Sequence, residues 1–292
     1  MSRSILSLLS AASLALASGA ARAQEHSPEQ SSGHEPAHET DHGGGDYPTA
    51  VIDRPLELPK GMLELHANIL ANLSKGIEGF GGETVYGPFK PTLLGFGAAY
   101  GVDGHLQLGV STNGFCLTGS SGGCDKVFDD FAVEAAYGVL HQKGFELSLQ
   151  AGVGFAHFDA TEVALGLGID LKVTSGQFAI RAGPKLQFGL TQRDGPNREF
   201  LQIPIIFQVQ VNPHLALEAG VALNLGIDPP ESVGFGNWLG VPVQVGALYA
   251  VDKHLDLGAL FGFSNLLGKE SIVYGRSGID DRFLQIFCAY RI

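Results

Sequence analysis

The stretch that decides the fold is Leu215-Ala-Leu-Glu-Ala-Gly-Val-Ala-Leu-Asn-Leu-Gly-Ile227. From Leu215 to Ile227 every second residue is apolar and mostly large, and the residues between them are Ala, Gly, Glu and Asn. Side chains alternate across a strand, so this pattern predicts a β-strand with two unlike faces. A soluble sandwich would carry charges on its outer face. Here the second face is mostly small, which suits the inside of a barrel whose bulky face meets lipid.

The same alternation recurs along most of the chain. It predicts about twelve strands, most of them with the ten or so residues that a tilted strand needs to cross a membrane. We therefore expect an all-β fold, a closed antiparallel up-and-down transmembrane β-barrel over residues 61–292. Of the connections after the odd-numbered strands, only the one near Asp159-Ala160-Thr161 is short. The expected strands are 61–74, 92–102, 106–115, 131–140, 145–157, 162–173, 178–190, 200–211, 215–227, 238–251, 255–265 and 282–292.

The connections between these strands alternate in length. Short turns are expected at 103–105, 141–144, 174–177, 212–214 and 252–254, and long connections mostly lie between them. Outer-membrane barrels have short periplasmic turns and long outer loops, so the short end is predicted to be periplasmic.

Three of the short turns are nearly the same: Val102-Asp-Gly-His-Leu106, Val211-Asn-Pro-His-Leu215 and Val251-Asp-Lys-His-Leu255. We interpret their histidines, His105, His214 and His254, as turn and rim residues rather than metal ligands.

Four tyrosines occupy the bulky phase at one depth: Tyr100, Tyr137, Tyr249 and Tyr290. Each lies two residues before the apolar residue that ends its strand, and all four strands run toward the short-turn end. A ring with a polar tip prefers the boundary between lipid and water. The pattern predicts an aromatic belt at the periplasmic interface.

The N-terminal region is predicted to be exported and unfolded. Arg3, the short apolar stretch Ile5–Ala17 and the small-x-small site Ala21-Arg22-Ala23 are typical of a cleaved signal peptide over residues 1–23. Residues 24–60 are expected to form a His-rich, disordered periplasmic leader, which is of low complexity up to about residue 50. Its histidines are weak metal candidates, and a solvated linker is favoured because they show no fixed ligand spacing. They are His26, His34, His38 and His42.

Three cysteines are present. Cys116 and Cys124 flank a Gly/Ser-rich stretch and are candidates for a loop disulfide in an oxidising envelope, with two free thiols as the alternative. Cys288 stands alone near the C-terminus.

Charged residues of the non-bulky phase gather toward the periplasmic half. An ion pair is expected between Asp170 and Arg181, with Val173 opposite Phe178, and Arg291 is expected to approach Glu64 where the barrel closes. The cluster is either a constriction that selects solutes or a structural network in a narrow barrel. Inward glycines at 95, 97, 166, 168, 220 and 246 either widen the lumen or relieve crowding. The members of this candidate lumen cluster are Glu64, Glu146, Asp170, Lys172, Arg181, Glu218, Asp256 and Arg291.

The last strand, 282–292, resembles the C-terminal signal that the barrel-assembly machinery recognises, through Tyr290 and Ile292. The usual terminal Phe or Trp is absent, and Phe287 stands where Gly is common. Over 61–292 the chain resembles Gram-negative outer-membrane barrels, including transporters of aromatic-catabolism pathways. The resemblance implies a location in the cell outer membrane, contact with its lipids and lipopolysaccharide, and passive transport of an unknown small solute.

Two other functions are considered. One is a structural or adhesion barrel with a closed lumen, which acts through its extracellular loops. The other is a rim hydrolase using His157 near Asp159; no Ser motif accompanies them, and such sites are recognised by geometry. We expect no enzymatic activity, no catalytic residue and no cofactor. The formal net charge of −12 argues against nucleic acid as a partner.

Overall fold

The computed structural model describes residues 47–74, 77–78, 84–86, 88–89, 91–118, 126–128, 130–156, 158, 161–194, 197–227, 239–266 and 278–292. The predicted signal peptide and the leader up to residue 46 lie outside these ranges. Within them, no helix combines the length and apolar character needed to cross a membrane.

The described strands form a closed, twelve-stranded antiparallel barrel, which confirms the predicted fold class. Two of the twelve are interrupted, so each carries two labels. A small separate hairpin, β2 (Ile77–Glu78) with β3 (Thr84–Tyr86), and the 3-10 turn η3 (Gly278–Asp280) lie in the connections. The barrel strands are β1 (Leu63–Asn72), β4 (Thr92–Gly101), β5 (Leu106–Cys116), β6 (Asp130–Gln142), β7 (Phe145–Ala156), β8 (Glu162–Ser175), β9 (Phe178–Ala182) with β10 (Lys185–Gly189), β11 (Phe200–Asn212), β12 (Leu215–Gly226), β13 (Leu239–Gly240) with β14 (Val243–Ala250), β15 (Leu255–Phe263) and β16 (Arg282–Arg291).

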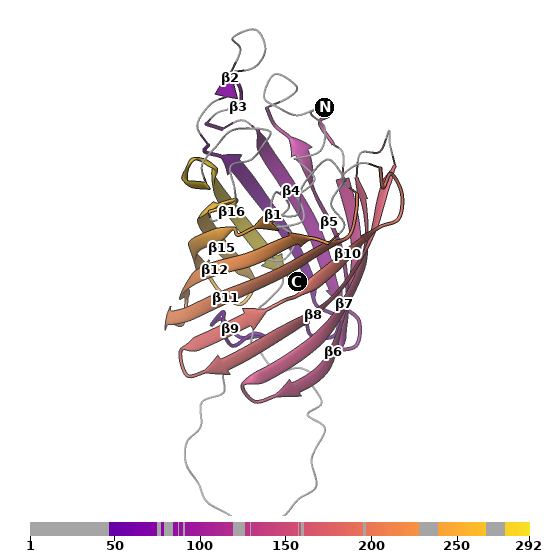
Figure 1. Cartoon of the computed structure of the whole chain (residues 1–292). Coiled ribbons are helices and arrows are strands. Elements are labelled where there is room, and N and C mark those ends of the chain that lie inside the picture. Colours follow the sequence, from indigo (N-terminus) through magenta and orange to yellow (C-terminus); the bar gives the residue numbers. More distant parts are fainter. Residues whose placement is uncertain are drawn as a thin grey trace, which may run out of the picture.

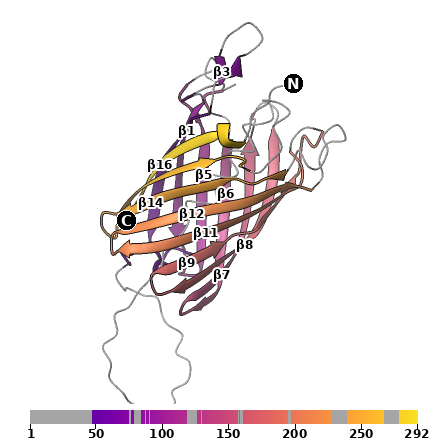
Figure 2. The same cartoon turned by 60° about the vertical axis from the view of Figure 1, so that its left-hand side comes forward.

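The barrel closes because β1 pairs with both β4 and β16. The strands are strongly tilted, the β2–β3 hairpin lies beyond one end, and the tight β6–β7 and β8–β9 turns lie at the other (Figures 1 and 2). Short and long connections therefore alternate as expected.

Proline explains the two interruptions. Pro184 separates β9 from β10, and Pro242 separates β13 from β14. Proline has no N–H to donate to a ladder. Its carbonyl still accepts: Ile169 N donates to Pro184 O at 3.0 Å, and Ala222 N donates to Pro242 O at 3.0 Å. Both strands therefore stay in the barrel wall across the break.

The four predicted belt tyrosines point outward near the short-turn end. Tyr100, Tyr137, Tyr249 and Tyr290 are 46%, 51%, 49% and 48% exposed. Three of them pair across the ladder with the leucine that ends a repeated turn: Tyr137 with Leu106, Tyr249 with Leu215 and Tyr290 with Leu255. Their role at a membrane boundary stays a prediction.

The repeated turns share one hydrogen-bond pattern. Asp103 Oδ1 accepts from the backbone N–H of the next His and Leu at 2.9 and 2.7 Å, and the same is true of Asn212 and Asp252. The histidine carbonyls then accept from Gly138, Ala250 and Arg291 of the neighbouring strands. His105, His214 and His254 therefore extend the sheet ladder, in agreement with their interpretation as turn residues.

The register between β8 and β9 differs from the prediction. Ser175 pairs with Phe178, and Lys172, not Asp170, stands opposite Arg181. The turn has two residues because Gly176 adopts a φ of +58°, which a tight hairpin of this kind requires. A shift of two residues keeps every side chain on its face, so the charged residues still point inward.

The inward glycines serve both purposes considered above. A Cβ on Gly97 would meet the His66 ring at 2.1 Å, and one on Gly246 would meet Leu260 at 2.3 Å, so these glycines relieve crowding. A Cβ on Gly166 would have its nearest neighbour at 3.9 Å, so the wall there is open. The inward glycines therefore lie beside bulky side chains at some positions and leave open space at others.

Candidate functional site: a plugged lumen and the cavity beside it

Residues 47–60, called the plug from here on, are folded inside the short-turn end of the barrel. Val51, Ile52 and Arg54 are only 1%, 2% and 1% exposed. The prediction of a disordered leader reaching residue 60 is therefore corrected for this part. Unlike the sequence of residues 24–46, that of the plug contains several large apolar residues, namely Val51, Ile52, Leu56 and Leu58. These residues were the sequence signal that this part of the leader is folded.

The plug follows the inner wall past successive strands. Its backbone N–H groups donate to inward side chains: Ile52 N to Gln210 Oε1 at 3.2 Å, Leu56 N to Glu146 Oε2 at 2.7 Å, and Leu58 N to Gln107 Oε1 at 2.9 Å. These acceptors lie on β11, β7 and β5, close to the short turns. A buried backbone N–H needs a partner, so the wall's polar side chains fix the path of the plug.

Arg54 anchors the plug to the opposite wall. Its Nη2 lies 2.7 Å from Asp256 Oδ1, and its Nη1 contacts Asp256 Oδ2, so the pair is bidentate. The guanidinium also donates to the plug's own carbonyls, Pro48 O at 2.9 Å and Thr49 O at 2.8 Å. One arginine thus closes the plug on itself and ties it to β15.

Tyr47 lies between two guanidinium groups. Its ring centroid is 5.6 Å from Cζ of Arg54 and 5.1 Å from Cζ of Arg291, both within cation–π range. Burial raises the pKa of the Tyr47 hydroxyl above its usual range, against the opposing effect of Arg291 and Arg54. The phenol therefore stays neutral.

Both expected ion pairs of the candidate cluster are present. Arg291 Nε lies 2.7 Å from Glu64 Oε2, and Arg181 Nη2 lies 2.5 Å from Asp170 Oδ2, although Asp170 and Arg181 are not directly opposite. A diagonal neighbour is within reach of a long side chain.

The remaining members of the cluster differ in whether they contact the plug. Lys172 Nζ donates to Arg54 O at 2.8 Å and lies 4.0 Å from Glu146 Oε1. Glu218 instead accepts from Gln208 at 3.3 Å. The sequence reasoning missed the plug's own charges, Arg54 and Glu57, and Glu57 Oε2 lies 2.8 Å from His141 Nε2 on β6. The cluster therefore forms, in large part, the seat of the plug.

Several predicted sites fall outside the described residues. They are Cys124, His157, Asp159 and the four leader histidines. Cys116 is disulfide-bonded and Cys288 is a free thiol, so the pairing of Cys116 with Cys124 stays a prediction. Among the described residues no group of three or more His, Cys, Asp or Glu is placed to hold a metal ion.

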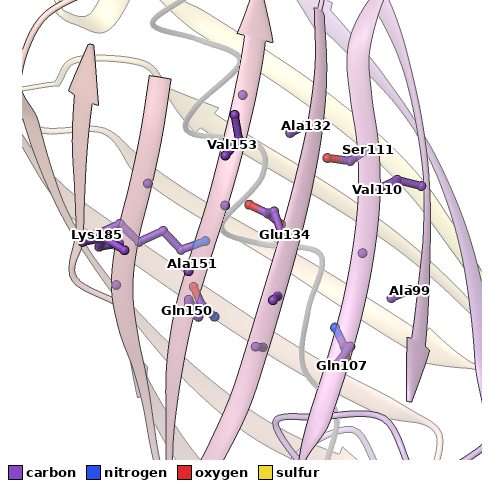
Figure 3. A pocket seen from close by; sticks show the side chains of 18 of the residues that line it. Ala99, Gln107, Val110, Ser111, Ala132, Glu134, Gln150, Ala151, Val153 and Lys185 are labelled. Carbon is purple, nitrogen blue, oxygen red and sulfur yellow. The ribbon is translucent and has the colours of Figure 1, made fainter. Parts of the chain in front are cut away.

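A cavity of about 210 Å³ lies beside and above the plug. Its floor includes Pro55, Leu56 and Leu58 of the plug, and it extends to Gly154 and Phe200 at the far ends of β7 and β11. The wall is built largely from the glycines and alanines of β6, β7 and β8. Figure 3 shows Glu134, Gln150 and Lys185 extending into this space. The lumen is thus closed by the plug at the short-turn end and contains an open cavity between the plug and the other end.

The fold is that of outer-membrane porin-like β-barrels. No protein-family model and no curated protein sequence matches the chain. Among solved structures, it is similar to the NanC porin, with a TM-score of 0.54 and 9% identity over 79% of this chain and 100% of that one. It is also similar to the KdgM porin, with a TM-score of 0.52 and 6% identity over 78% and 98%. A third is the COG4313 outer membrane channel from Pseudomonas putida F1, with a TM-score of 0.54 and 12% identity over 80% and 97%. At these identities the likeness establishes the fold.

Proposed function

We propose that this chain is an outer-membrane channel for small solutes whose periplasmic mouth is closed at rest by the plug. The observation that carries the proposal is the pairing of a hollow lumen with a closure made by a separate segment of chain. The barrel wall itself leaves space for a solute, and residues 47–60 take up that space at one end.

The chemistry of the plug's seat supports a closure that opens. Its charged and polar contacts, such as Arg54 with Asp256 and Leu56 N with Glu146, can be exchanged for contacts with water. Buried ion pairs contribute less net stability than well-packed apolar groups of similar size. A segment held in this way is displaced at lower cost than a strand of the wall.

The plug also favours a second function, a closed barrel that acts through its loops. In that case the plug is a permanent filler, and the lumen carries nothing. The two functions differ in what removal of the plug does to permeability.

The test compares the purified full chain with a variant lacking residues 47–58 in planar lipid bilayers. A channel closed by its plug conducts rarely when complete and steadily when the plug is removed. A second variant, with residues 47–58 replaced by a Gly/Ser segment of equal length, separates loss of the plug from shortening of the chain. If both variants fold, as judged by heat-dependent electrophoretic mobility, and neither conducts, the channel proposal fails and the closed barrel remains.

A further inference from the structure

Two oppositely charged side chains lean toward each other along a glycine-rich part of the cavity wall. Glu134 on β6 extends over β7, where a Cβ on Gly152 would lie 3.1 Å from Glu134 Cγ. Lys185 on β10 extends over β8, where a Cβ on Gly168 would lie 2.8 Å from Lys185 Cγ. The two glycines leave room for both charged chains to lean toward each other along the wall (Figure 3).

These two charges do not neutralise each other. Within the described part of the chain, neither the Glu134 carboxylate nor the Lys185 ammonium has an ion-pair or hydrogen-bond partner. Glu134 pairs with Gly152, Gly152 with Gly166, and Gly168 with Lys185. Three strand spacings therefore separate the two side chains, or roughly 14 Å between backbones. An unneutralised carboxylate and ammonium at that separation favour a ligand with both charges between them.

Polar atoms beside Glu134 also favour a ligand that donates hydrogen bonds. Gln150 Oε1 and Ser111 Oγ line the cavity and are buried, with no hydrogen-bond partner among the residues that the structure describes. Both neighbour Glu134 diagonally, because Gln150 pairs with Ala136 and Ser111 pairs with Ala132. Ser111 lies on the β5 side of Glu134, whereas Glu134 extends over β7, so the acceptors that lie together are the Glu134 carboxylate and Gln150 Oε1. A primary ammonium can donate to both. A buried polar atom without a partner is costly, so these atoms are better satisfied when a donor is present.

We propose that the cavity binds a small zwitterion of the amino-acid type, with its ammonium at Glu134 and Gln150 and its carboxylate at Lys185. This inference rests on the proposed function, for which it names the solute class. The apolar floor formed by Pro55, Leu56 and Leu58 faces the uncharged part of the solute.

The test is isothermal titration calorimetry of the detergent-solubilised full chain with three probes that share a four-carbon chain. They are 4-aminobutanoate, butanoate and butylamine. We expect saturable binding of 4-aminobutanoate and at least tenfold weaker binding of the two probes that lack one charge. Glu134→Gln and Lys185→Met should each weaken the binding of 4-aminobutanoate by about tenfold or more. Glu218 is an inward carboxylate outside the cavity, so Glu218→Gln should leave this binding unchanged.

A charge exchange makes the test independent of any single variant. Glu134→Lys and Lys185→Glu should each abolish binding, and the double variant should restore it with the zwitterion reversed. Equal binding of all three probes, or no binding to a folded wild-type chain, overturns the inference. Conductance in simple salt is measured separately, so a chain that conducts without binding 4-aminobutanoate contradicts the zwitterion site and leaves the channel function intact.

Discussion

Arg54 and Asp256 are separated by 202 positions in sequence and form a bidentate pair inside the barrel, with Arg54 1% and Asp256 3% exposed. Asp256 also lies 2.7 Å from Arg291 Nη2. One carboxylate is therefore shared by an arginine of the plug and an arginine of the last strand. Its position makes it the side chain on which docking of the plug depends most.

We expect Asp256→Asn to loosen the plug without unfolding the barrel. Removing one partner of a buried ion pair costs about 3–5 kcal/mol, and Arg291 keeps its pair with Glu64. Because each 1.4 kcal/mol is about a factor of ten, the fraction of time spent conducting should rise at least tenfold. Hydrogen exchange over residues 47–58 should accelerate in parallel. Glu218→Gln makes the same chemical change away from the plug and should alter neither measurement. If Asp256→Asn leaves both the conducting fraction and the hydrogen exchange unchanged, the plug does not depend on this ion pair.

We expect Gly258→Ala to destabilise the barrel through Phe287. A Cβ at Gly258 would lie 2.1 Å from the tip of the Phe287 ring, which fills the lumen beside it. Overpacking of this kind costs typically about 1–3 kcal/mol. The melting temperature, followed by heat-dependent mobility, should fall in Gly258→Ala and recover in Gly258→Ala/Phe287→Leu. Gly109→Ala is the matched control, since its Cβ would meet nothing closer than 3.6 Å; an equal loss in both single variants would mean that strand propensity, not the ring, is responsible.

The turn carboxylates are expected to make stability depend on acid pH. The backbone N–H groups of Leu106 and His105 lower the pKa of Asp103 below its ordinary value of 3.8, and those of His254 and Leu255 do the same for Asp252. A carboxyl with a lowered pKa stabilises the folded state above its unfolded pKa, and this contribution is lost as the pH falls through the folded value. Asn212 makes the same hydrogen bonds without titrating. Between about pH 5 and about pH 3 the wild-type melting temperature should therefore fall more than that of Asp103→Asn/Asp252→Asn; parallel curves would contradict this.

Gly168→Ala is expected to disturb the cavity without disturbing the plug. The new Cβ would lie 2.8 Å from Lys185 Cγ and 3.0 Å from Pro184 O, so the lysine stem must move. We expect binding of 4-aminobutanoate to weaken several-fold while hydrogen exchange over 47–58 stays unchanged. Gly240→Ala, in the barrel wall outside the cavity with its nearest neighbour at 3.6 Å, should leave binding unaltered. Equal weakening by both variants would argue against a specific role for the lysine position.

The wall of the barrel was predictable because each of its features is local. Alternation in stretches such as 215–227 defines the faces, and Asp103-Gly104-His105 defines a turn. The register after β8 was wrong by two because the pattern has a period of two and does not distinguish a four-residue turn from a two-residue one. Only the positive φ of Gly176 decides between them.

The plug was not predictable in the same way. Leu56 and Leu58 have no strand phase that assigns them a face, and three prolines, Pro48, Pro55 and Pro59, exclude a regular element. The inward charges were identified correctly, but their partner was sought among other strands. Arg54 lay in a region whose composition resembles a linker, so a contact 202 positions away had no local signal.

That separation also orders the assembly of the molecule. The plug is made before any strand, yet its seat includes Asp256 on β15 and, through Tyr47, Arg291 at the end of β16. The contacts of Arg54 and Tyr47 therefore form late, since contacts this distant need the intervening loops to close, whereas Leu56 and Leu58 contact strands that are made earlier. Protection of Arg54 and its neighbours from hydrogen exchange should therefore appear only when β15 and β16 are in place, and it reports on completion of the barrel.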